Sequence, residues 1–160
     1  MKKLRCIGGQ DDALLAYASE FLYARPASLA GALLMRDVGN LQVAVLARDG
    51  QFQVELGVLA GGTVIPAHVH PHVDTIEIGV AGAVRLMVNG VDPFAAVPDE
   101  RLGRFTRSRG IRINRGDLHS GLVLPGGAMF LSVQCWSGLP SSVLEDYVGE
   151  PVSSMHRTGV

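Results

Sequence analysis

The sequence has little of what marks several protein classes. It holds only two cysteines, Cys6 and Cys135, which are too far apart for a disulfide framework and fit a reducing cytoplasm. No segment approaches the roughly 18 to 20 consecutive apolar residues that a membrane-spanning helix needs. The basic start at residues 1–12 lacks the apolar run of a secretory signal. A net charge of −1 gives no overall reason to expect nucleic-acid binding. We therefore expect a soluble, cytoplasmic protein with neither a membrane nor a nucleic acid as partner.

What the chain does contain is enough apolar sequence for one core. Of its 160 residues, 48% are hydrophobic and 18% are charged, which predicts a single domain over 1–160. An amphipathic helix is expected at 10–26, within a helical N-terminal extension at 10–36. Residues 137–160 are expected to form a tail with one short helix.

The middle of the chain, about 40–136, is dominated by strand signals. Residues 41–62 read as two β runs joined across Asp49-Gly50, a favoured hairpin turn. Further strand-like runs lie at 63–70, 75–80, 83–88, 104–113, 118–124 and 128–136. Short strands separated by turn signals predict an all-β sandwich or a small barrel.

Two histidines inside this region are placed to share a ligand. Side chains two apart on a strand face the same way, so His68 and His70 project together, roughly 6.6 Å apart at their Cα atoms. Two imidazoles in this arrangement can bind one metal ion. A third imidazole, His119, follows Gly116 at the end of another strand-like run and could approach from across a barrel.

The spacing of these residues resembles the cupin family. The first cupin motif contains a glycine, two histidines and a second glycine, and their spacing matches that of Gly62, His68, His70 and Gly82. The motif's glutamate position is occupied by Thr75. The second motif contributes a glycine and a histidine that match Gly116 and His119, while its proline is Asn114 and a following asparagine is Val123.

The resemblance implies a double-stranded β-helix, the cupin jelly-roll barrel. It also implies a metal held by His68, His70 and His119, and a homodimer with contacts from residues 11–24 and 128–136. Members of the family that have three-histidine sites include non-haem Fe(II) dioxygenases.

A second register competes with the first. His70, His72 and Glu77 also satisfy the motif's ligand spacing, but its glycine positions would then be Val64 and Val84, so we favour the first register. His72 is then a rim residue in a turn.

Glu77 shares a strand face with Thr75, one repeat of roughly 6.6 Å further along. A buried carboxylate is costly unless paired or hydrogen-bonded, so Glu77 is expected to face the metal, a metal-bound water or a cation. We assign it as a catalytic general base. The alternative is a structural ion pair with Arg85. Thr75, His72 and Arg85 are the expected substrate-binding residues.

Three neutral imidazoles leave a divalent ion with its full charge, which favours a small, anionic, chelating substrate. The donor set suits transition metals, with Fe(II) favoured and Zn, Ni, Mn or Cu as alternatives. The first hypothesis is therefore an Fe(II) dioxygenase. The alternatives are a non-catalytic small-molecule binding or sensing protein, and a metal-dependent isomerase or lyase acting on a sugar or keto acid.

A basic stretch separates the two motifs. Residues 101–115 hold six of the fourteen Lys and Arg residues and no acidic residue. If 104–113 is a strand, Arg107 and Arg109 share one face and could bind a substrate anion. The favoured reading is a solvated edge strand whose charges discourage aggregation.

Overall fold

A computed structural model describes residues 35–38, 40–143 and 145–149 of the chain. This part contains eight strands and one helix. In chain order they are β1 (Met35–Val38), β2 (Leu41–Asp49), β3 (Phe52–Leu59), β4 (Val64–Val69), β5 (Val73–Val88), α2 (Asp99–Ser108), β6 (Ile111–Ile113), β7 (His119–Trp136) and β8 (Val148–Gly149). The helix expected at 10–26 lies outside the described residues.

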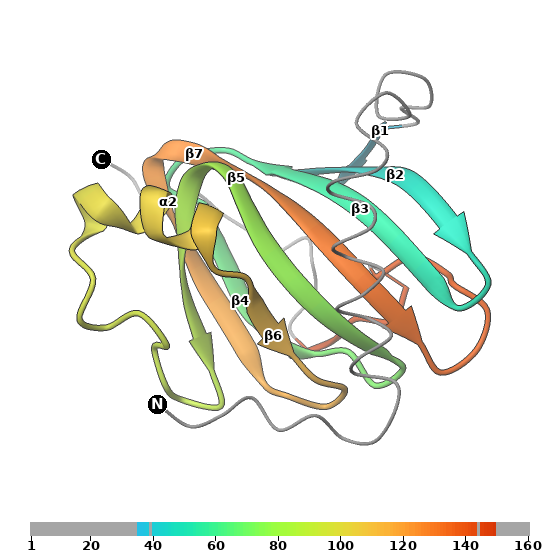
Figure 1. The fold of residues 1–160 in the computed structure, drawn as a ribbon. Coiled ribbons are helices and arrows are strands. Elements are labelled where there is room, and N and C mark those ends of the chain that lie inside the picture. The colour runs from blue at the N-terminus through green and yellow to red at the C-terminus, as the bar shows by residue number, and fades with distance from the viewer. Residues whose placement is uncertain (1–34, 39, 144, 150–160) are drawn as a thin grey trace.

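Two long strands, β5 and β7, build the barrel by pairing antiparallel along nearly their whole length. The C-terminal half of β7, at 128–135, is hydrogen-bonded to β3, whereas its N-terminal half, at 119–122, pairs with β4. β5 and β7 therefore pass together from one sheet into the other, which is the topology of a double-stranded β-helix (Figure 1). The expected fold class is confirmed.

The passage between the two sheets depends on glycine. The β5–β7 register shifts between Gly79 and Ala81 and again between Gly82 and Val84. Gly82 has φ +61°, and a Cβ there would lie 1.9 Å from the carbonyl oxygen of Gly127. No side chain fits between two backbones this close, so the bend requires glycine at this position.

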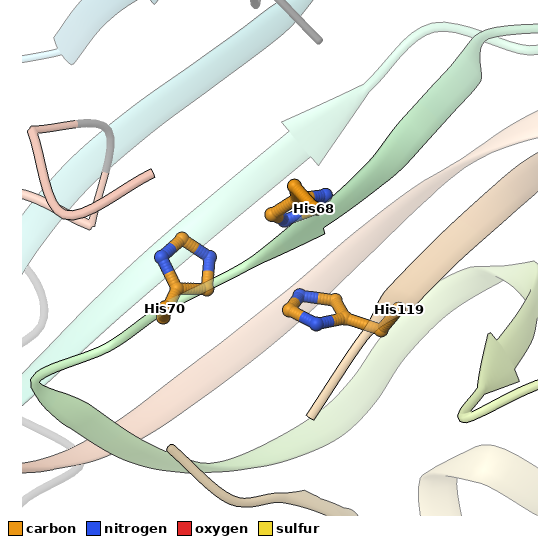
Figure 2. A group of neighbouring side chains, drawn as sticks. All are labelled: His68, His70 and His119. Carbon is orange, nitrogen blue, oxygen red and sulfur yellow. The ribbon is translucent and has the colours of Figure 1, made fainter. Parts of the chain in front are cut away.

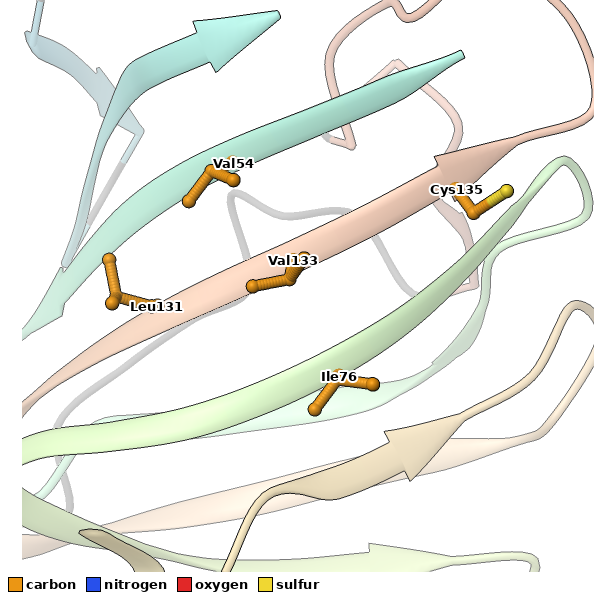
Figure 3. Close-up of a cluster of buried hydrophobic side chains, with 5 residues drawn as sticks. All are labelled: Val54, Ile76, Leu131, Val133 and Cys135. Carbon is orange, nitrogen blue, oxygen red and sulfur yellow. The ribbon is translucent and has the colours of Figure 1, made fainter. Parts of the chain in front are cut away.

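Alternation along the strands separates an inner from an outer face. Glu55 on β3, Glu77 on β5 and Ser132 on β7 line the interior cavity. Their neighbours in sequence face the other side of the sheet, because successive strand side chains alternate. That outer face carries a buried apolar cluster of Val54, Ile76, Leu131, Val133 and Cys135 (Figure 3).

Most of the expected strands are present, although two pairs of them are joined into single long strands. The hairpin across Asp49-Gly50 is confirmed, with Gly50 at φ +58°. The runs at 75–80 and 83–88 are one bent strand, β5, and those at 118–124 and 128–136 are one bent strand, β7. Because the C-terminal half of β7 is paired on both sides, it offers no free edge to a second copy.

The strand expected at 104–113 is wrong for its first half, because residues 104–108 lie in helix α2, and only Ile111–Ile113 form a strand, β6. Buried residues Leu102 and Thr106 recur one helical turn apart, and Asp99 and Glu100 occupy a first turn where acidic side chains are favourable. α2 packs closely on β5: a Cβ at Gly103 would lie 2.7 Å from the Gly82 carbonyl oxygen.

The end of the described chain differs from expectation as well. Residues 137–143 and 145–149 contain no helix. Instead, β8 pairs with β4, placing Gly149 opposite His68 and Val148 opposite Val69. Among the described residues, no helix is long and apolar enough to cross a bilayer.

Candidate metal centre and its cavity

The structure brings three histidines together from two elements. β4 carries His68, His70 follows the end of β4, and His119 begins β7 in direct register with His68. Their ring centroids are 4.0 Å apart for His68 and His119, 4.9 Å for His68 and His70, and 5.3 Å for His70 and His119. One nitrogen from each ring lies within 4.8 Å of the others, and the three rings surround a common point (Figure 2).

Backbone carbonyl groups orient two of these rings. Nδ1 of His68 lies 2.7 Å from the Pro66 carbonyl oxygen, and Nδ1 of His119 lies 2.9 Å from that of Asp117. A carbonyl oxygen only accepts, so each Nδ1 carries the proton and each Nε2 keeps its lone pair for another ligand. The ring of His70 is buried as well, and the backbone of Asp146 is its hydrogen-bonding neighbour.

The three imidazoles are held neutral. Burial is the main cause that lowers the pKa of His68 to about 3 and that of His70 to about 4, and the neighbouring His119 lowers both further. Burial also lowers the pKa of His119, although Asp117 opposes the change. Neutral imidazoles with free lone pairs are the donors that divalent transition metals prefer.

The glycines that precede the histidines hold the segments in place. Gly62 at φ +76° donates its N–H to the Val123 carbonyl oxygen over 3.0 Å. Gly116 at φ +77° donates to the carbonyl oxygen of His70 over 3.0 Å. The second bond ties the turn before His119 directly to the backbone of His70.

A residue that sequence reasoning missed covers one side of the histidines. The ring of Tyr147 stacks on His68, with centroids 4.2 Å apart and planes at 18°. Tyr147 also lines the cavity and meets His70 edge-on at 6.1 Å. No spacing rule links position 147 to position 68, because only the β4–β8 pairing brings them together.

The histidines face a cavity of about 140 Å³. Its walls are mainly aliphatic. The polar side chains that line it are those of Glu55, His68, His70, Thr75, Glu77, Thr106, His119, Ser132 and Tyr147. No lysine or arginine is among the described lining residues. His68 and His119 come from the β4–β7 sheet, whereas Glu55, Glu77 and Ser132 come from the β3–β7–β5 sheet, so the two groups belong to opposite walls.

Glu77 is inside the cavity but outside the histidine cluster. Its Oε1 accepts a hydrogen bond from the Ser132 hydroxyl at 2.7 Å, and Thr75 is a second hydrogen-bonding neighbour of the buried carboxyl group. Burial raises the pKa of Glu77 to about 7, with hydrogen bonds from Ser132 and Thr75 opposing the change and Glu55 adding to it. Thr75 is buried and also lines the cavity.

Glu55 is a second cavity carboxylate that sequence reasoning missed. It is 2% exposed and accepts hydrogen bonds of 2.8 Å from the side-chain amides of both Gln53 and Gln134. The Gln134 amide also contacts Ser132 at 3.2 Å, so one buried polar network includes both carboxylates. The sequence signal for Glu55 is its position in β3, because residues 53, 55 and 57 alternate along the strand and therefore share one face.

Arg85 does not lie at the cavity, so its expected substrate-binding role is not supported by its position. Its guanidinium donates to Asp92 and Asp99 and to the carbonyl oxygens of Phe94 and Val97, which anchors the loop before α2. The alternative of an ion pair between Arg85 and Glu77 is wrong for the same reason.

His72 is exposed and lies outside the histidine cluster. Its ring Nδ1 is 2.6 Å from Oδ1 of Asp146, and its backbone N–H donates a hydrogen bond to Oδ2 of the same residue at 3.0 Å. The second motif register, which needs His72 and Glu77 beside His70, is therefore not assembled.

The expected pairing of Arg107 and Arg109 on one strand face is also wrong. Arg107 is in α2, where its Nε donates to the Gly103 carbonyl oxygen, and Arg109 lies over the ring of Phe105 at 4.9 Å. Neither residue lines the cavity.

Comparison with known proteins yields structures rather than sequence families. No family model matches the sequence, and no curated protein matches it. KdgF from Halomonas sp. superposes with a TM-score of 0.52 at 15% identity, covering 66% of this chain and 93% of that one. An uncharacterised protein with a double-stranded β-helix domain from Klebsiella pneumoniae gives 0.50 at 18%, covering 66% and 84%. A structure from a study of the DMSP lyases RdDddP and RnDddQII gives 0.52 at 14%, covering 69% and 60%. At these identities the likeness concerns the fold alone.

Proposed function

Because this chain is a cupin by fold, we propose that it is a metal-dependent enzyme whose divalent transition metal is held by His68, His70 and His119. The observation that carries the proposal is the meeting of three neutral imidazoles around one point at the wall of a cavity. Backbone carbonyl oxygens accept from Nδ1 of His68 and of His119, which leaves the Nε2 atom of each ring available to a metal.

The donor set fits a metal with open coordination positions. Three protein ligands leave room for a substrate, as catalytic rather than structural sites require. Thr75 stands where the cupin motif has its glutamate, so the ion keeps its full positive charge and attracts a chelating anion. With no lysine or arginine among the described lining residues, the metal would be the main cationic group that such an anion meets.

The first candidate reaction is Fe(II)-dependent dioxygenation of a small anionic chelating substrate. Bound iron would supply the redox chemistry with O2, while the chain binds and orients the substrate and excludes water from an aliphatic cavity. Glu77, which lines the cavity, would remove a proton from the substrate, since a general base works best with a pKa near the working pH.

The second candidate is an isomerase or lyase reaction on the same metal, in which the ion acts only as a Lewis acid. The pKa of about 7 for Glu77 favours it, because proton transfer is the central step of such reactions. The likeness to a structure from a study of DMSP lyases is compatible with this candidate through fold only. A binding or sensing role without catalysis is the third candidate.

Metal analysis after anaerobic purification tests the centre itself. Wild-type protein should contain one equivalent of a transition metal, His68→Ala should contain almost none, and the matched variant His72→Ala should retain it. Unchanged metal content in His68→Ala would refute the site. Consumption of O2 that requires Fe(II) supports dioxygenation, whereas turnover that is independent of O2 with zinc or nickel supports the second candidate.

A further inference from the structure

The inner face of the β3–β7–β5 sheet contains a polar row whose groups bond to one another. Strand register places Glu55 and Glu77 on either side of Ser132. Ser132 donates its hydroxyl proton to Glu77, and Thr75 is a further hydrogen-bonding neighbour of that carboxyl group. The side-chain amide of Gln134 donates to both Glu55 and Ser132. The two carboxyl groups of this row are therefore bonded within the wall itself.

The next row of the same face, one strand repeat along, is apolar. Phe130 lies between Gly57 on β3 and Gly79 on β5, and all three residues line the cavity. A Cβ at Gly57 would lie 2.4 Å from Cζ of Phe130, so the aromatic ring lies across this glycine. A Cβ at Gly79 would lie 2.7 Å from Oγ1 of Thr106 on α2. The two glycines therefore let the Phe130 ring lie on the sheet and let α2 approach the cavity.

The wall that bears the histidines has an apolar row as well. Two residues beyond His119, the next position on the same face of β7 is Gly121. It lies between Ile65 on β4 and Leu86 on β5, and both of these side chains line the cavity. Ile65 and Phe130 pack against the same buried apolar cluster, so the apolar rows of the two walls meet at one end of the cavity. This end is the apolar chamber, lined by Ile65, Val84, Leu86 and Phe130.

The apolar chamber and the histidine cluster belong to one cavity of about 140 Å³. An apolar protein cavity of about 150 Å³ can hold one benzene molecule, so this cavity has room for a small ligand of similar bulk. Burial of each methylene group of such a ligand would strengthen binding about fourfold.

We propose that the cavity selects a small carboxylate, or a related chelating anion, whose apolar body has about six carbon atoms. The anionic end lies at the histidines, and the apolar body fills the chamber beside the Phe130 ring. This inference rests on the proposed metal centre for the anionic end. Burial of apolar surface provides the selectivity, because the carboxyl groups of the polar row already bond within the protein.

Straight-chain carboxylates on cobalt-loaded protein test the proposal. Dissociation constants of acetate, butanoate, hexanoate, octanoate and decanoate are measured from the visible cobalt spectrum at pH 7. Affinity should rise about fourfold for each added methylene group up to hexanoate and should gain nothing beyond octanoate, because the chamber is then full. The isostere 5-hydroxypentanoate, in which a hydroxyl replaces the terminal methyl of hexanoate, should bind at least about tenfold less tightly than hexanoate.

Three outcomes of this series would overturn the proposal. They are an affinity that does not depend on chain length, a gain that continues to decanoate, and equal binding of hexanoate and its hydroxyl isostere. The first and third would show that the chamber does not bind the chain, and the second would place the chain on an open surface.

Variants separate the chamber from general effects. Val84→Phe should fill the chamber and remove the gain from added methylene groups, while the affinity for acetate, which is too short to reach it, stays as in wild type. Phe130→Leu should enlarge the chamber and move the end of the gain to a longer chain. The matched control Leu122→Phe enlarges a side chain that is 41% exposed, and it should behave as wild type. A wild-type dependence on chain length in both cavity variants would overturn the proposal.

Cobalt uptake and acetate affinity are measured first, so failure of the metal centre is seen separately. If the wild type takes up no cobalt, metal-free protein is titrated with benzene in a calorimeter. Saturable binding that Val84→Phe abolishes supports the apolar chamber. No saturable binding to wild type, or binding that persists in Val84→Phe, overturns it.

Discussion

The buried carboxyl group of Glu77 should make the stability of the metal-free protein depend on pH. Its pKa rises from 4.5 to about 7 because burial disfavours the ionised form. In the unfolded chain the group loses its proton near pH 4.5, but in the folded chain it keeps it until about pH 7. Between these values the folded state binds more protons, so this group's contribution to stability is fully present below pH 4.5 and is lost as the pH rises through 7.

The magnitude follows from the two pKa values. Each pH unit between them changes the free energy of unfolding by about 1.4 kcal/mol, so ionising Glu77 in the folded protein costs about 3 kcal/mol. Glu77→Gln keeps the shape of the side chain and cannot ionise. The variant should therefore gain about 3 kcal/mol relative to wild type on going from pH 4.5 to pH 8.

The assay is urea unfolding of both proteins in the presence of a chelator, at half-unit steps from pH 4.5 to 8.5. Subtracting the two stability curves removes the contribution of the histidines, whose lowered pKa values affect both proteins equally. Glu100→Gln, which changes an exposed acid, should give a difference that varies by less than about 0.5 kcal/mol over this range. A flat difference curve for Glu77→Gln would show that the carboxyl group is hydrated and would refute our account of the cavity wall.

Three further predictions follow from other parts of the structure. Zinc affinity measured by equilibrium dialysis should begin to fall only below the usual histidine range, because burial lowers the pKa of all three histidines, to about 3 for His68 and about 4 for His70. A decline that already begins near pH 6.5 would contradict the buried, neutral site. Gly82→Ala should destabilise the fold by about 3 kcal/mol or more in urea unfolding, because its Cβ would lie 1.9 Å from a backbone oxygen. The control Gly90→Ala, with φ +75° and open space around it, should lower the free energy of unfolding by only about 1 kcal/mol. Equal losses in the two variants would show that the barrel bend tolerates a side chain. Arg85→Met should leave metal content unchanged but increase hydrogen exchange in the loop before α2, since the guanidinium bonds to that loop three times and to Asp99 at the start of α2. An unchanged exchange rate would refute the anchoring role.

The predictions from sequence succeeded where a local rule was sufficient. The hairpin at Asp49-Gly50 needs only a turn that tolerates positive φ, and the alternation of apolar residues is enough to indicate strands. The strand predicted at 104–113 was wrong over 104–108, because Leu102 and Thr106 are spaced one helical turn apart and pack α2 against β5. Strand boundaries in β5 and β7 failed because a glycine that usually marks a turn can also bend a continuous strand.

In the candidate site as well, local sequence rules predicted some residues and only the tertiary structure revealed others. Spacing alone placed His68 and His70 on one face and singled out His119, because strand period and turn glycines are local properties of the chain. Tyr147 and the Glu55 network could not be found that way, since each depends on pairing between strands far apart in sequence. Arg85 was assigned to the substrate for its charge, although its partners are Asp92 in the loop that follows β5 and Asp99 at the start of α2.

Periodicity in the amino-acid sequence by itself determined the all-β class, and the spacing of the glycines and histidines, through its resemblance to the cupin motifs, implied the double-stranded β-helix and the set of three histidines. Tertiary structure alone decided which polar groups share the cavity, which nitrogen atoms are free to bind and which carboxyl group holds its proton near neutral pH. The physical reason is that burial and electrostatic coupling act through space between opposite walls of the barrel, and the order of residues along a strand does not specify these distances.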